Sequence, residues 1–127
     1  NISDTRTGGS FSMLAHHASS VTKDKETVFI QGCVSARLDR FLAGGDEKKN
    51  GPVYLKIDVD GIEHEVLAGA RDLITDARLL SVLVELDPRC AAHQRAFQDL
   101  LQAGLSPDIA SQRRWDAGLT ANFIFWR

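Results

Sequence analysis

The chain has 127 residues, a hydrophobic fraction of 43% and a formal net charge of −2 at pH 7. A chain of this size can bury one modest core, so we expect a single domain over residues 1–127. The small net charge offers no electrostatic footprint for nucleic acid, and no apolar run approaches the roughly 18 residues of a membrane span. Cys33 and Cys90 form neither a C-x-x-C motif nor a ligand spacing with histidine, which argues against zinc and favours a reducing, cytoplasmic setting.

The first part of the chain is expected to contain little regular structure. Residues 1–25 are rich in Ser, Thr, Gly and Lys, which predicts a loop with one short strand over 10–14. A further strand is expected to start at Val28. Apolar residues at helical spacing then predict a short helix over 38–42.

Residues 53–127 are expected to form the core strands and helices. Apolar runs bounded by turn residues predict strands, and the runs between them have the spacing of amphipathic helices. Such alternation is typical of an α/β fold with parallel pairing at the centre of its sheet. The strands are expected over residues 53–59, 79–87, 105–109 and 122–126.

Two helices are predicted between these strands. The first is expected over 62–76, where apolar residues recur on one face. The second has clear boundary signals, with Asp87 as N-cap, Pro88 at the first helical position and Gly104 as a left-handed C-terminal cap.

Charged residues interrupt two of the predicted strands and mark their carboxyl ends. Side chains alternate between faces, so Lys56, Asp58 and Asp60 share one face, and Glu85 and Asp87 share a face of the next strand. Strands covered on both faces are usually apolar throughout, so these charges should be paired or should contact a ligand. We therefore expect Lys56 or Asp58 to meet Glu85, either as a structural ion pair or in a site. In open α/β sheets, ligands bind beyond the carboxyl ends of the strands.

The segment that joins these strands resembles a known family. Residues 56–70, Lys-Ile-Asp-Val-Asp-Gly-Ile-Glu-His-Glu-Val-Leu-Ala-Gly-Ala, are similar to the K-I-D-V-E-G-x-E-x-x-V-L-x-G-A signature of FkbM-type methyltransferases. Asp60 stands where that signature usually has Glu. Other segments of the chain that are similar to the family lie at residues 1–4, 35–42, 82–86 and 122–125.

The resemblance implies a Rossmann-like methyltransferase fold that binds S-adenosylmethionine. The implied reaction is methyl transfer to an oxygen of a sugar, polyketide or similar small metabolite. The family's first strands and glycine-rich cofactor loop are expected upstream of Asn1. The chain, which begins without Met, is therefore expected to be the C-terminal half of the domain.

Four side chains are the candidates for catalysis. Asp58 is the first candidate for the carboxylate near the transferred methyl group, where it would place the acceptor hydroxyl or take its proton. Glu63 would orient that group or hold the acceptor, and Glu85 would contact the acceptor or a metal. His64 is a candidate base because imidazole titrates near neutral pH, and the alternative is an exposed helix residue.

Only a few residues of this chain are expected to contact the cofactor. Ser3 and Asp4 would border the adenine, and Asp58 would lie beside the activated methyl group. No metal ligand is assigned, and metal dependence stays open: Asp58, Asp60, Glu63 and Glu85 could ligate magnesium, but their spacing alone does not require it. The expected partners are a small-molecule or saccharide acceptor.

Two other interpretations remain open. Asp58-Val59-Asp60-Gly61 also resembles the D-x-D-G opening of haloacid-dehalogenase-type phosphatases, although Ile62 stands where Thr is usual. Alternatively, half a sheet would leave an exposed strand edge, through which a non-catalytic truncated domain would form a homodimer.

Overall fold

The computed structural model describes residues 36–43 and 51–127. The chain divides into two compact units, of which one contains Ala36–Asp58 and Glu63–Arg127. The other contains Asn1–Ser35 and Val59–Ile62. All helices and strands of the described residues belong to the first unit. The loop predicted over 1–25 and the strands predicted at 10–14 and from Val28 lie outside the described residues.

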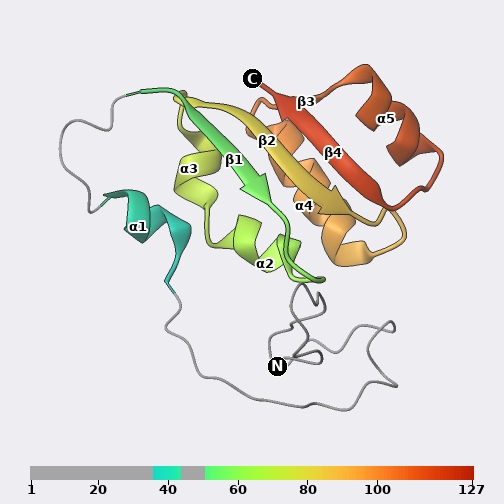
Figure 1. Cartoon of the computed structure of the whole chain (residues 1–127), viewed down its shortest axis with the longest axis horizontal. Coiled ribbons are helices and arrows are strands. Elements are labelled where there is room, and N and C mark those ends of the chain that lie inside the picture. Colours follow the sequence, from blue (N-terminus) through green and yellow to red (C-terminus); the bar gives the residue numbers. More distant parts are fainter. Residues whose placement is uncertain (1–35, 44–50) are drawn as a thin grey trace, which may run out of the picture. The chain divides into compact units, whose positions relative to one another are not determined.

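A four-stranded sheet forms the centre of the first unit, with strand order β1-β2-β4-β3 (Figure 1). The strands β1 and β2 are parallel, as predicted. The prediction of parallel pairing at the centre of the sheet is wrong for the described strands, because the central pair, β2 and β4, is antiparallel, as is the pair β3 and β4. The unit therefore has an α/β fold with a mixed sheet. Among the described residues, β1 is an edge strand of this sheet. The strands are β1 (Val53–Ile57), β2 (Leu79–Leu86), β3 (Ser106–Pro107) and β4 (Ala121–Trp126).

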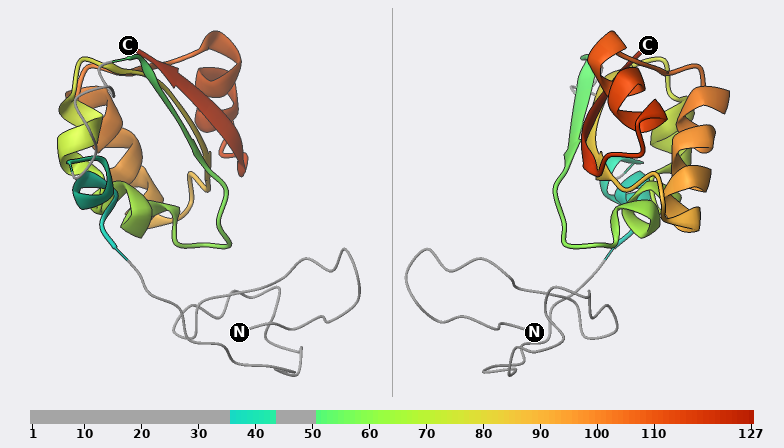
Figure 2. Two further views of the ribbon diagram at one scale, coloured as in Figure 1. Left: turned by 60° about the vertical axis from the view of Figure 1, so that its left-hand side comes forward. Right: turned by 90° about the vertical axis from the view of Figure 1, so that its right-hand side faces the viewer.

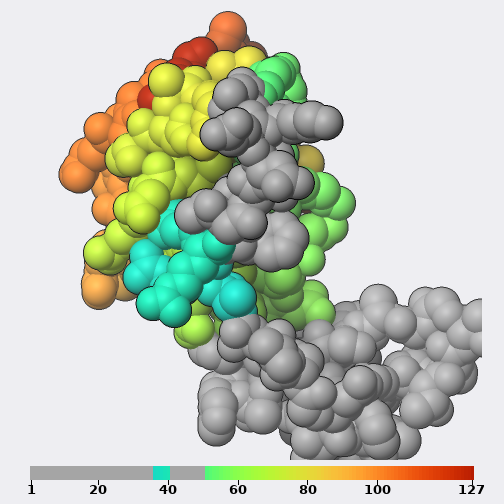
Figure 3. Space-filling model, turned by 90° about the vertical axis from the view of Figure 1, so that its left-hand side faces the viewer, coloured from blue at the N-terminus to red at the C-terminus, as the bar shows by residue number. Residues whose placement is uncertain are grey.

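Helices cover one face of this sheet (Figure 2). The helix α1 lies against α3 on the outer side of that layer, as Figure 3 shows. None of the helices in the described ranges is both long and apolar enough to cross a bilayer. The helices are α1 (Leu38–Ala43), α2 (Glu63–Ala68), α3 (Arg71–Thr75), α4 (Ala91–Gln102) and α5 (Ile109–Asp116).

The core lies between the sheet and the helix layer. Phe97 of α4 is 2% exposed, stacks on Trp115 of α5 at 3.8 Å between ring centroids, and meets Phe125 of β4 edge-on at 5.1 Å. Aromatic pairs of this kind stabilise the fold by about 0.5–1.5 kcal/mol beyond the effect of the area that they bury. Ile57 and Val84, which are register partners in β1 and β2, are buried on the same side.

No described element covers the opposite face of the sheet. Tyr54 is 63% exposed and Trp126 49% exposed on this face, and Lys56 and Glu85 are exposed as well. The expectation that Lys56 and Glu85 lie in strands covered on both faces is therefore wrong for the part of the chain that the structure describes. These charges sit on an open face, so no buried partner is needed.

The helix predicted over 62–76 is broken into α2 and α3. The break falls at Gly69 and Ala70, where Ala70 takes non-helical dihedrals of φ −121° and ψ 22°. The Asp39 carboxylate of α1 accepts a hydrogen bond from the Leu73 N–H at 3.1 Å, and its own N–H donates to the Gly69 carbonyl at 3.2 Å. A side chain from a different helix thus caps the start of α3.

The predicted start of the following helix is also wrong. The helix α4 begins at Ala91 with Cys90 as the N-cap residue, rather than at Pro88 after an Asp87 cap. Asp87 instead closes a turn, because its Oδ1 accepts the Arg89 N–H at 2.9 Å. The predicted end is confirmed, since Gly104 follows α4 with a positive φ of 86°.

The last helix, α5, was not expected from the sequence. The strand predicted over 105–109 is reduced to β3, and Ile109 already begins α5. Asp108 is its N-cap, with its side chain accepting the Ser111 N–H at 2.6 Å. A short acidic residue before a helix is a preferred cap, so this signal was present in the sequence.

Candidate functional site

The carboxyl ends of β1 and β2 lie side by side. Ile57 pairs in parallel register with Val84, and Asp58 and Glu85 are the residues that follow each of them. Side chains alternate along a strand, so Asp58 and Glu85 occupy the same face, opposite to Ile57 and Val84. The predicted adjacency of these two strand tips is confirmed.

Asp58 forms an ion pair within its own strand. Its Oδ2 lies 2.7 Å from the Lys56 Nζ, and the two side chains are 59% and 62% exposed, respectively. The expected contact of Lys56 or Asp58 with Glu85 on the neighbouring strand is therefore wrong: Lys56 and Asp58 pair with each other instead. Exposed pairs contribute about 0–1 kcal/mol, so this contact leaves Asp58 readily accessible to another polar group.

Glu63 lies on the inner side of the same end of the sheet. It is 2% exposed at the start of α2, and its Oε2 is 3.6 Å from the His93 Nε2 of α4. His93 is 8% exposed, and its Nδ1 accepts a hydrogen bond from the Asp87 N–H at 2.9 Å. Glu63 is thus held between helices, whereas Asp58 is exposed on the sheet.

His64 lies beside this buried contact. Its ring centroid is 5.4 Å from that of His93, and its Nε2 is 3.9 Å from the Glu65 Oε1. The side chain is 29% exposed, so His64 is partly buried rather than an exposed helix residue. Its assignment as a base remains a prediction.

Asp87 is secured by an arginine that sequence reasoning did not single out. Arg89 donates to both Asp87 carboxylate oxygens, at 2.9 and 3.1 Å, and also to the Thr120 Oγ1 at 3.0 Å. The hydrogen bond from Arg89 lowers the pKa of the Asp87 carboxyl to about 2, against a smaller opposing effect of burial. The Asp-Pro-Arg turn was a usable sequence signal for this pair, whereas nothing local indicated the role of His93.

Three further residues were considered for the site. Ser3 and Asp4 lie outside the described residues, and Asp60 is an exposed residue of the other unit. Within the described ranges, no group of three or more His, Cys, Asp or Glu side chains could hold a metal ion.

A groove of about 570 Å³ lies between the helices on the outer side of the helix layer. It runs between α2–α3 and α4, with Arg71, Arg95 and Asp99 among its lining residues. Neither Asp58 nor Glu85 lines it. The groove is thus separate from the pair of strand tips.

Comparison with known proteins gives one match. The model of the methyltransferase FkbM domain family matches residues 2–106, which include β1, β2 and both strand-tip carboxylates. Comparisons with curated proteins and with solved structures gave no match. No finding supports the phosphatase alternative.

Proposed function

The chain belongs to the methyltransferase FkbM domain family, and we propose from this premise that it takes part in S-adenosylmethionine-dependent methyl transfer. The proposed acceptor is an oxygen of a sugar or another small metabolite. The observation that supports this most directly is the placement of Asp58 and Glu85 on adjoining strand tips, on the open face of the sheet.

The charge of these residues fits the proposed cofactor. Asp58 and Glu85 are acidic and exposed, and they directly follow the register pair Ile57 and Val84 near the carboxyl ends of two parallel strands, where ligands bind in open α/β sheets. Carboxylates favour a nearby positive charge. S-adenosylmethionine, when bound, supplies a methyl group on a positively charged sulfur.

The proposed roles follow from where each side chain lies. Asp58 would accept a hydrogen bond from the acceptor hydroxyl and take its proton, which raises the nucleophilicity of the oxygen. Glu85 would bind a second polar group of the acceptor, so that the hydroxyl is held in line for transfer. Glu63 is buried, so we assign it to orienting the start of α2 from inside the protein. His64 is kept as a second candidate base.

We further propose that the chain is the C-terminal part of a Rossmann-like methyltransferase domain. The edge position of β1 among the described residues supports this, because a further strand can pair with its outer side. Ser3 and Asp4 would add contacts to the adenine. If no such strand pairs there, the same edge would favour a homodimer, which size-exclusion chromatography with light scattering would detect.

The test combines cofactor binding with turnover. The chain is titrated calorimetrically with S-adenosylhomocysteine, and methyl transfer to a panel of hexose glycosides is followed by release of that product. We expect Asp58→Asn to lower turnover at least about 100-fold, because it removes the proton acceptor. Asp116→Asn, which changes an exposed acid at the end of α5, is the matched control and should leave turnover unchanged.

The alternatives give different results. Binding only by a version extended upstream of Asn1 would support the partial-domain proposal. Absence of binding by both versions would contradict the proposed function. Turnover of an aryl phosphate with magnesium, abolished by Asp58→Asn, would favour a phosphatase instead.

A further inference from the structure

A buried histidine links two helices below the strand tips. His93 in the first turn of α4 is 8% exposed and lies between the Asp87 N–H, just after β2, and the Glu63 carboxylate, at the start of α2. The three groups come from segments that are separated in the sequence but meet at one end of the sheet. A single ring therefore contacts both segments.

The hydrogen bond from Asp87 determines which nitrogen of the ring carries the proton. The Nδ1 accepts from the Asp87 N–H at 2.9 Å, so it must present its lone pair. In the neutral ring the proton then resides on Nε2, which faces the Glu63 Oε2 at 3.6 Å. This distance is longer than a hydrogen bond and leaves an electrostatic contact between an N–H and a carboxylate.

We propose that His93 is a positioning residue of the site, a neutral Nε2–H histidine that fixes the start of α2 relative to the end of β2. Its two nitrogens have different tasks: Nδ1 holds the backbone beyond β2, and Nε2–H faces the Glu63 carboxylate. Through these contacts it sets the spacing between the segments that follow the two strand tips.

The charged groups around His93 act in opposite directions. Burial lowers the pKa of the ring below its ordinary value, and His64 adds to this effect. Glu63 and Asp87 act to raise the pKa of the ring, without overcoming burial. The ring is thus kept neutral at neutral pH, as acceptance of the Asp87 N–H requires.

The first test reads the tautomer directly. Nitrogen NMR of the full chain with labelled histidine should show an unprotonated Nδ1 and a protonated Nε2 for His93 at pH 7.5. His93→Gln identifies the signals by their disappearance. A proton on Nδ1 would overturn the proposal, because that nitrogen could then not accept from Asp87.

A matched pair of variants tests the contact with Glu63. Glu63→Gln removes a negative charge that raises the pKa of His93, so NMR titration should show a lower pKa. His64→Gln removes a group that lowers it, so the pKa of His93 should rise. A histidine that only fills space would show no opposite shifts, and an unchanged pKa in Glu63→Gln would overturn the proposal.

The lowered pKa also sets the sign of a pH effect on stability. Below about pH 6.5 an unfolded histidine binds a proton that the folded His93 resists, so the free energy of unfolding should fall as pH decreases from there through the folded pKa. His93→Gln should lose this part of the pH dependence. If His93→Gln kept the full pH dependence of the free energy of unfolding, the lowered pKa of His93 would not be its source.

The consequence for turnover rests on the proposed function, whereas the NMR and stability tests do not. His93→Asn can keep an acceptor near the Nδ1 position, and His93→Gln can keep a donor near Nε2. We expect each variant to lower kcat about tenfold with little change in cofactor affinity. Misplaced side chains hold the reacting atoms less often in the geometry that the transfer needs, which lowers the rate of the chemical step. If the NMR predictions hold and no methyl transfer is found, the proposed function fails and the positioning role stands.

Discussion

The two ends of the sheet are built from different chemistry. At the amino ends of β1 and β2, Arg127 donates to the carbonyl oxygens of Leu79, Ala103 and Ile74, which come from β2, the end of α4 and α3. At the carboxyl ends, Asp58 and Glu85 are exposed, whereas the contact between Glu63 of α2 and His93 of α4 is buried.

The two ends differ in whether their polar groups already have hydrogen-bond partners within the protein. Arg127 uses its guanidinium to satisfy carbonyl groups that helix ends and a strand start would otherwise leave without partners. At the other end, Asp58 contacts the exposed Lys56, and such a contact stabilises little. We infer that the polar contacts at the amino end stabilise the fold, whereas Asp58 and Glu85 at the carboxyl end remain accessible to solvent.

Among the polar contacts, the largest effect on stability is expected at the amino end. Arg127→Ala removes hydrogen bonds from a charged donor to three backbone carbonyls, so we expect the free energy of unfolding to fall by about 2–3 kcal/mol. Urea denaturation followed by circular dichroism measures this. In whichever version of the protein binds S-adenosylhomocysteine, that binding should be retained at low denaturant, because Arg127 lies away from the strand tips.

The control for this change is Arg113→Ala, which removes an exposed arginine of α5. It should alter stability by no more than about 0.5 kcal/mol. If Arg127→Ala were equally mild, the amino end would not be the stabilising end, and the comparison would fail.

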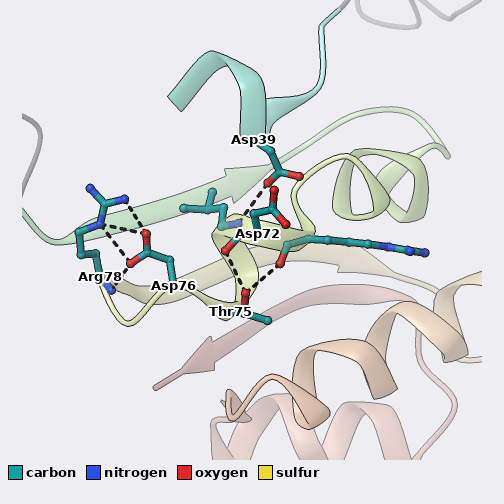
Figure 4. A network of polar contacts seen from close by, with 7 residues as sticks. Asp39, Asp72, Thr75, Asp76 and Arg78 are labelled. Atoms are coloured by element: carbon teal, nitrogen blue, oxygen red, sulfur yellow. Dashed lines mark hydrogen bonds and ion pairs between the residues drawn. The ribbon is translucent and has the colours of Figure 1, made fainter. Parts of the chain in front are cut away.

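A smaller effect is expected between the two ends, at the junction of α2 and α3. Figure 4 shows Asp39 of α1 reaching the first turn of α3, where it caps Leu73. Burial acts to raise the pKa of the Asp39 carboxyl, but hydrogen bonds from Arg37 and from backbone amides outweigh it, so the pKa is lowered. Asp39→Ala should cost about 1 kcal/mol, the usual value of a lost N-cap.

Asp39→Asn is the conservative comparison, because it keeps an acceptor for the Leu73 N–H and loses only the charge. It should recover more than half of the stability at pH 7 in the same denaturation measurement. Since the pKa of Asp39 is lowered, the advantage of the native aspartate over the asparagine variant should disappear as the solution is acidified through the folded pKa. Equal loss in both variants at pH 7 would show that the cap is not what Asp39 contributes.

The strands β1, β2 and β4, and the parallel pairing of β1 with β2, were accessible from the sequence for a simple reason. The apolar runs of β1, β2 and β4 are bounded by turn residues, and one helical connection between β1 and β2 makes them parallel neighbours. The adjacency of Asp58 and Glu85 follows from that rule alone. Periodicity and a chain-topology rule were enough here because both are local in the sequence.

What escaped the sequence depends on contacts between distant segments. The break at Gly69 is accompanied by the Asp39 cap from α1, which the apolar spacing of residues 62–76 does not reveal. The helix α5 buries only Ser111, so it has no apolar stripe to detect. The burial of Glu63 against His93 likewise requires that α2 and α4 be packed together.

The smallest effect is expected at the carboxyl end, from Lys56→Gln. This change removes the exposed ion pair with Asp58, so the free energy of unfolding should change by less than about 0.5 kcal/mol. The matched control is Ile57→Ala, the next residue on the covered face, which should cost about 3 kcal/mol because Ile57 is 3% exposed. Both are measured by urea denaturation. A loss above about 1 kcal/mol for Lys56→Gln would mean that its face of the sheet is covered, and the strand tips would then not be free to bind.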